Sequence, residues 1–348
     1  MDRDQLLKKI FESDVTSPLL RKKGSFVVDD TLGAGLLFAS IFKEKPANYA
    51  LISSNQYAAQ KLYEFLLNFL KEDEVVFFPS DELLRAEALS SSRELLSQRL
   101  YALGQLRRPG PKILVTHPSA LLRYLPSPKR FDEETIRIKA GDSFDLSTLK
   151  VHLLEMGYQA TSHVDKSLQF ASRGDILDIF SVSYLDPIRI EFFGDEVESI
   201  RLFNARSQES KSPLKEVEIL PATDLFLNDD ELSSFAERAK DRLEKDKKIL
   251  SPEVGQLIEQ NLELVLNDFI EHDYRSELYR YYGFALGQAY SVIDYFSPEL
   301  VYVANKETFD SATKQLVTNA FNYYQETFLK GQNLSHLSQY MPLEQAIK

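Results

Sequence analysis

The segment that decides the local fold is PIRIEFFGDEVESIRLF, residues 187–203. Apolar and polar residues alternate along it, which is the period-two pattern of a half-buried β-strand. One face of the first strand is apolar and consists of Ile188, Ile190 and Phe192. The opposite face carries Arg189, Glu191 and Phe193. The residues at 194–196, Gly-Asp-Glu, predict a tight hairpin turn into a second, antiparallel strand.

The face with Arg189, Glu191 and Phe193 has two interpretations. If it faces solvent, Phe193 is an exposed aromatic residue beside charge, and arginine and aromatic residues are enriched at the energetic centres of protein interfaces. In the alternative, Phe193 packs under a neighbouring helix and Arg189 pairs with Glu191 or Asp195. The strand pattern by itself favours the second interpretation.

On either side of this segment, the pattern of predicted helices and strands changes at two places along the chain. Up to about residue 125, strands are expected at 25–28, 49–53, 75–78 and 112–116, and helices at 36–42, 58–69, 93–106 and 118–125. This alternation predicts a parallel sheet with helices on both faces. After the Pro-Ser-Pro at 126–128, a strand at 135–139, a helix at 146–156 and short strands at 174–180, 188–193 and 197–203 predict an α+β unit. Beyond about residue 220 the pattern is helical at 229–247, 253–269 and 309–328, with a strand at 299–304.

Composition excludes several classes of function. The 348 residues include 53 acidic and 41 basic side chains, for a formal charge of −12, and no cysteine. A protein dedicated to binding nucleic acid usually has a basic surface patch and an excess of basic residues. The excess of acidic residues here argues against that function. Without cysteine there is no disulfide, thiolate zinc site or iron–sulfur cluster, and the five histidines show no metal-binding spacing, so no metal is expected. Neither a signal peptide nor a membrane-spanning run is visible, which predicts a cytoplasmic protein with no membrane partner.

Gly33 and Gly35 lie where a phosphate-binding loop would follow the first strand. A working loop needs G-x-x-x-x-G-K-[ST], because the lysine neutralises phosphate charge and the hydroxyl holds Mg²⁺. Two leucines follow Gly35 instead, and Asp29 and Asp30 add negative charge. We expect a degenerate nucleotide loop, with glycines that serve close helix packing. No catalytic residue and no cofactor are therefore expected in this chain.

The segment from Arg173 to Arg201 resembles the UvrB-like module of the bacterial transcription-repair coupling factor family, Mfd. The resemblance rests on Arg173-Gly174, on LDIF at 177–180 and on residues 187–201, and further matches are FFPSDE at 77–82, QRLYAL at 98–103, VTHPSAL at 115–121 and Gly-Tyr at 157–158. UvrB shares the central block but keeps a GKT loop and a tyrosine-rich hairpin, both of which are missing here. One departure from the family is Gln-Glu-Ser at 208–210, where Gln-Arg-Ser is usual.

The resemblance implies an α/β fold: a RecA/P-loop-like parallel-sheet domain with a degenerate nucleotide site, into which a small α+β domain is inserted. The implied division is domain 1a at 1–128, domain 2 at 129–210 and domain 1b at 211–348. Residues in the family that contact UvrA match Arg173, Arg189 and Phe193. This match changes the interpretation of the mixed face from a packed surface to an interface.

The implied function is that of a non-catalytic N-terminal module. It recruits UvrA, packs against the C-terminal domain to keep the full-length protein inhibited, and links stalled RNA polymerase to nucleotide excision repair. ATP, Mg²⁺, RNA polymerase and DNA would belong to further domains, including an ATP-dependent double-stranded-DNA translocase, so the chain is expected to be part of a longer protein. The alternatives are a UvrB-like DNA-damage-binding module and a nucleotide-binding helicase fragment. The acidic charge, the missing hairpin and the missing lysine argue against them.

Overall fold

The computed structural model describes residues 2–13, 16, 31–80 and 93–347. The strand predicted at 25–28, the acidic pair Asp29 and Asp30, and the last two residues of the FFPSDE match lie outside the described residues.

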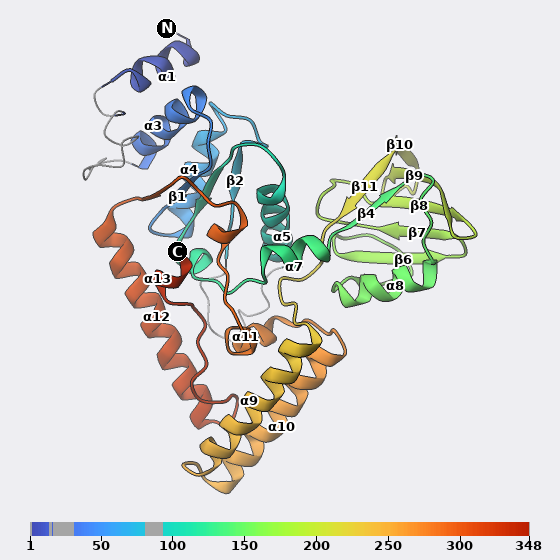
Figure 1. Ribbon diagram of the computed structural model, residues 1–348, viewed down its shortest axis with the longest axis vertical. Helices are drawn as coiled ribbons and strands as arrows, with labels where there is room; N and C mark the ends of the chain where they lie inside the picture. Colours follow the sequence, from blue (N-terminus) through green and yellow to red (C-terminus); the bar gives the residue numbers. More distant parts are fainter. Residues whose placement is uncertain (1, 14–15, 17–30, 81–92, 348) are drawn as a thin grey trace.

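Within the described ranges, a sheet of four strands forms the centre of the larger part of the molecule (Figure 1). Its strands are β1 (Tyr49–Ile52), β2 (Val75–Phe77), β3 (Ile113–Thr116) and β12 (Leu300–Val303), in the order β12-β1-β3-β2. All three neighbouring pairs are parallel, which confirms the predicted parallel sheet. Because β12 pairs with β1, two segments about 250 residues apart in the sequence share one sheet.

Helices cover both faces of this sheet. Tyr49 and Leu51 of β1 are buried on the face covered by α1 (Arg3–Phe11), α3 (Thr31–Glu44) and α4 (Gln56–Leu66). Ala50 and Ile52 are buried on the other face, with α5 (Arg93–Arg107) and α6 (Pro118–Leu121). The predicted helices are present, although α6 ends four residues before the predicted position.

The second sheet stands to one side of the first (Figure 1). It contains β5 (Gln159–Ala160), β6 (Gln169–Arg173), β7 (Ile176–Ile179), β8 (Ile188–Phe193), β9 (Glu196–Phe203) and β10 (Ser210–Leu214), in the order β10-β9-β8-β7-β6-β5. Its pairs are antiparallel except β5–β6. Helix α8 (Leu146–Glu155) buries Leu149 and Leu153 in the same core as Ile188 and Ile190, so it covers one face of this sheet.

The chain enters and leaves the six-stranded sheet through two paired strands. After the short helix α7 (Pro128–Glu133), β4 (Ile136–Lys139) leads in, and β11 (Glu216–Ile219) leads out. The two pair antiparallel, from Glu216 opposite Lys139 to Ile219 opposite Ile136. Everything between them therefore begins and ends at one place. The division into domains 1a, 2 and 1b stays a prediction.

The remaining chain is mostly helical, as predicted. A hairpin of α9 (Asp229–Lys247) and α10 (Pro252–Ile270) is followed by η1 (Ser276–Leu278), α11 (Tyr279–Ala285) and η2 (Val292–Tyr295), and after β12 come α12 (Lys306–Leu329) and α13 (Leu343–Ala346). Asn228 begins α9 with a reciprocal capping box to Glu231, the expected chemistry of a helix start. Among the described residues, no helix has both the length and the apolar character needed to cross a membrane.

Candidate functional site

The candidate site is the outer face of the six-stranded sheet, which is the face opposite α8. Its side chains are Ala171, Arg173, Ile176, Asp178, Arg189, Glu191, Phe193, Ser199 and Arg201. The register produces this set, because residues directly opposite one another on neighbouring strands point to the same side. The buried side chains of Ile188, Ile190 and Phe192 confirm the predicted apolar face.

Phe193 is the most exposed aromatic side chain of this face, with 78% of its surface accessible. It is the last residue of β8 and lies directly before Gly194, whose φ of +62° makes the sharp turn into β9. The hairpin turn was predicted correctly. The alternative in which Phe193 packs under a helix is wrong.

Arg189 is held in place on the outer face. Its Nε and Nη2 donate to the two carboxylate oxygens of Asp178, each at 2.7 Å, and Nη2 also donates to Oε1 of Gln208 at 3.0 Å. The guanidinium lies 4.3 Å from the ring centre of Phe203, and only 17% of the side chain is exposed. The alternative interpretation, in which Arg189 pairs with Glu191 or Asp195, is wrong in this respect too, because Arg189 pairs with Asp178, directly opposite it on β7.

Glu191 and Arg201 make a second ion pair beside the first. Arg201 donates through both terminal nitrogens to the Glu191 carboxylate, and the Ser199 hydroxyl donates to Oε2 of Glu191 at 2.7 Å. Arg189 and Arg201 are directly opposite in the β8–β9 register, where like charges repel. The carboxylates of Asp178 and Glu191 compensate that repulsion, and so the two ion pairs stabilise the outer face together.

Glu191 should therefore resist protonation. Hydrogen bonds from Arg201 and Ser199 lower the pKa of Glu191 from 4.5 to about 2. A depressed carboxyl pKa stabilises the fold above the ordinary value, and this contribution is lost as the pH falls from about 4.5 towards 2. We expect an NMR titration of the Glu191 side-chain carboxyl to show this low midpoint. In Arg201→Gln the midpoint should move up; an unchanged midpoint would contradict the pairing.

Arg173 lies at the end of β6 and is exposed. Its Nη2 is 3.5 Å from the carbonyl oxygen of Ser162, which is a weak contact. A hollow of about 420 Å³ brings Arg173 and Arg189 together, and its other lining residues include Asp178, His163 and Gln208. Phe193 does not line this hollow, although it lies on the same face.

Sequence reasoning missed Asp178 and Gln208 as parts of the site. The alternation in LDIF at 177–180 carried a signal for Asp178, since its apolar neighbours point inward. Gln208 has a φ of +61° and reaches Arg189 from the turn after β9, a contact that no local pattern indicates. Gln208 is the first residue of the Gln-Glu-Ser triplet at 208–210.

The structure places Gly33 and Gly35 far from these residues, in the first turns of α3. Gly33 is exposed, and Gly35 is buried. A Cβ on Gly35 would lie 2.7 Å from Cδ1 of Leu62, so this glycine permits the close packing of α3 on α4. The residues just before the helix lie outside the described part of the chain. No group of three or more metal-binding side chains gathers among the described residues.

The chain matches known proteins in two ways. The family model of the UvrB interaction domain matches residues 136–225. This range contains β4 through β11 and therefore the whole outer face.

The second match extends over most of the chain. The chain is 30% identical over 246 residues to the transcription-repair-coupling factor of Bacillus subtilis strain 168, and this alignment covers 70% of the chain and 21% of that protein. It is 27% identical over 285 residues to that of Staphylococcus aureus strain RF122, and 26% identical over 286 residues to that of Staphylococcus haemolyticus. These two alignments cover 80% and 81% of this chain, and 24% of each relative. The chain thus spans about a fifth to a quarter of these relatives, and its residues 136–225 match the UvrB interaction domain within a region similar to transcription-repair-coupling factors.

Proposed function

We propose that the outer face of the six-stranded sheet binds UvrA, and that the chain is a docking module that links stalled RNA polymerase to nucleotide excision repair. The match to the UvrB interaction domain supports a protein partner of this kind. One observation carries the site: Phe193 stands 78% exposed on the matched domain, on the same sheet face as two ion-paired arginines. A large exposed aromatic residue on a face that also carries arginines is the composition typical of an interface centre.

The three predicted residues would have different roles. Phe193 would enter an apolar pocket of the partner, and Arg173 would offer an exposed cation at the rim. Arg189 would act mainly by holding the shape of the hollow, because its donors already serve Asp178 and Gln208. Removing Arg189 would leave the half-buried Asp178 without this cation, so Arg189→Ala mixes a folding effect with a binding effect. Phe193 is the cleaner test.

Phe193→Ala is expected to weaken UvrA binding about thirtyfold, since truncating a central interface residue costs roughly 2 kcal/mol or more. Its unfolding midpoint should stay within experimental error, because the side chain is already exposed. Affinity is measured by calorimetry with purified UvrA. The control is Leu185→Ala: Leu185 is 98% exposed and lies in the β7–β8 loop, at the other end of the sheet. Equal affinities for wild type and Phe193→Ala, or an equal loss in the control, would refute the site.

We further propose that the parallel-sheet part is RecA/P-loop-like with a degenerate nucleotide loop, and that this chain itself holds neither ATP nor Mg²⁺ and has no catalytic activity. The sequence around Gly35 supports this, because the lysine and hydroxyl of a working loop are missing. Calorimetric titration of ATP with Mg²⁺ should give no binding heat. Micromolar binding would contradict the proposal.

The finer roles implied by the resemblance are also proposals. In the full-length protein the module would pack against the C-terminal domain and keep it inhibited, while RNA polymerase and DNA would be bound by other domains. Adding this chain in trans to a protein that lacks it should then lower that protein's ATPase rate. An unchanged rate would count against autoinhibition.

A further inference from the structure

Among the described residues, strand β2 lies at one end of the parallel sheet. Its hydrogen bonds to β3 show which of its backbone groups point away from that partner. The Ile113 amide donates to the Glu74 carbonyl at 2.8 Å, and the Phe78 amide donates to the Val115 carbonyl at 3.0 Å. With Val75 opposite Ile113, these bonds assign the groups of Glu74, Val76 and Phe78 to β3. The amide and carbonyl groups of Val75 and Phe77 therefore point away from the sheet.

Those outward groups have no hydrogen-bond partner among the described residues. Val75 is only 2% exposed, so bulk water does not fully replace the missing hydrogen bonds of its backbone amide and carbonyl. A buried backbone amide or carbonyl without a partner costs free energy comparable to a lost hydrogen bond. The two residues line a cavity of about 480 Å³, which has room for a partner.

The other walls of the cavity come from two helices and from one loop of the second sheet. Helix α4 contributes Gln60 and Tyr63, α5 contributes the residues at 98, 101, 102 and 105, and the β7–β8 loop contributes the residues at 182–185. The Tyr63 ring stacks on Phe77, with 5.7 Å between ring centres. Ser183 adds a buried hydroxyl that has no partner in the described part of the chain. Free backbone groups between aromatic walls, with further hydrogen-bonding side chains, suit an extended peptide.

The charge of the cavity selects among peptides. Glu72 is the one ionisable carboxylate in its lining, and the lining contains no lysine or arginine. No ion pair among the described residues engages Glu72, which is exposed. A basic side chain on the bound segment would supply the missing partner.

We propose that this cavity binds an extended peptide segment, which adds to the edge of β2 as a further parallel-sheet strand and places a lysine or arginine beside Glu72. The site lies on the parallel sheet, apart from the outer face proposed to bind UvrA. Main-chain hydrogen bonds to Val75 and Phe77 would give affinity, and the charge of Glu72 would give preference for basic sequences.

The probe is acetyl-Val-Lys-Val-Lys-Val-amide, added to the full chain at millimolar concentration. Residue-resolved hydrogen exchange by NMR should show slower exchange of the Val75 and Phe77 amides, at least tenfold at saturation. The Val76 amide is already bonded to β3 and serves as the internal control, with no change. The same peptide with alternate backbone amides N-methylated should give no protection, because it cannot pair as a strand.

Charge is tested separately. Glu72→Gln should weaken the lysine probe about two- to fivefold, as expected for an exposed ion pair, and Asp73→Asn, next to it but outside the lining, should not. A Val-Glu-Val-Glu-Val probe should bind more weakly than the lysine probe. Unprotected Val75 and Phe77 amides at saturation, equal binding of the N-methylated peptide, or loss of binding in Phe193→Ala would each overturn the proposal. The last result would place the peptide on the outer face instead.

Discussion

Asp224→Ala is expected to lower the free energy of unfolding by about 3–5 kcal/mol, the cost of removing one partner from a buried ion pair. The Asp224 carboxylate is 2% exposed and accepts from Nε of Arg99 at 3.0 Å and from Nε and Nη2 of Arg123 at 3.0 and 3.2 Å. Burial acts to raise the pKa of Asp224, but the charges of Arg123 and Arg99 outweigh it and hold the pKa well below its usual range. Removing the carboxylate would leave two buried cations close together.

The two ion pairs of Asp224 join distant parts of the chain, so their loss is expected to destabilise the whole fold. Arg99 belongs to α5, Arg123 follows α6, and Asp224 follows β11, where the chain returns from the six-stranded sheet. The Arg123 guanidinium also lies 3.8 Å from the ring centre of Tyr279 in α11. Urea denaturation followed by circular dichroism measures the change. Asp195→Ala, in the exposed β8–β9 turn, should stay within about 0.5 kcal/mol of wild type, and an equally small effect at Asp224 would disprove the argument.

Asp246→Ala is expected to cost about 3 kcal/mol and to release the C-terminal segment from α9. Asp246 is fully buried and accepts from the amide and hydroxyl of Ser335, at 2.9 and 2.7 Å, and from Nε and Nη2 of Arg242, at 2.9 and 2.8 Å. Alanine would leave the buried Ser335 amide without this acceptor. The segment after α12 would then open more often than the rest of the chain.

Limited proteolysis followed by mass spectrometry would detect that opening as faster cleavage between residues 330 and 347. Asp241→Ala is the matched control, because Asp241 lies on the same helix and is exposed. Faster cleavage confined to other parts of the chain would show that Asp246 does not anchor this segment.

Much of the fold could be predicted because its helices and buried strands carry strong periodic patterns. Most of the strands that were missed lack such patterns, although β11 was missed despite the alternation of Glu-Val-Glu-Ile. β6 reads Gln-Phe-Ala-Ser-Arg and has a single large apolar side chain, and β10 is almost wholly exposed and contains Pro213 at the edge of the sheet. These strands form because neighbouring strands offer hydrogen-bond partners, and that information is not local in the sequence.

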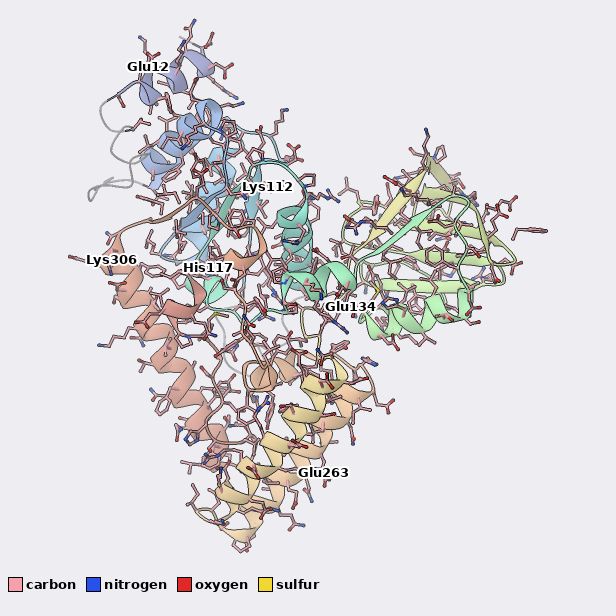
Figure 2. The ribbon with its side chains drawn as sticks, viewed as in Figure 1. Glu12, Lys112, His117, Glu134, Glu263 and Lys306 are labelled. Carbon is pink, nitrogen blue, oxygen red and sulfur yellow. The ribbon has the colours of Figure 1, made fainter. Side chains whose placement is uncertain are left out.

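The same limit applies to the site. Alternation predicted correctly which side chains of β8 point inward, but the partner of Arg189 depends on the register between β7 and β8. That register joins Arg189 to Asp178 across the sheet rather than to neighbours along the chain. Glu134 is a similar case (Figure 2): it binds Arg130, one turn away on the same helix, at 2.7 Å, and His152 of α8 at 3.2 Å. The local pair follows from helix spacing, whereas the distant one follows only from the tertiary fold.

The pairing of β4 with β11 has a consequence for the history and engineering of the molecule. Because the two strands are hydrogen-bonded neighbours, the points where the intervening chain begins and ends are only about 5 Å apart. A two-residue bridge could close that gap, so the segment could be removed or transplanted onto another host without pulling the parallel sheet open. Such a modular joint lets recombination exchange the whole intervening unit in one step.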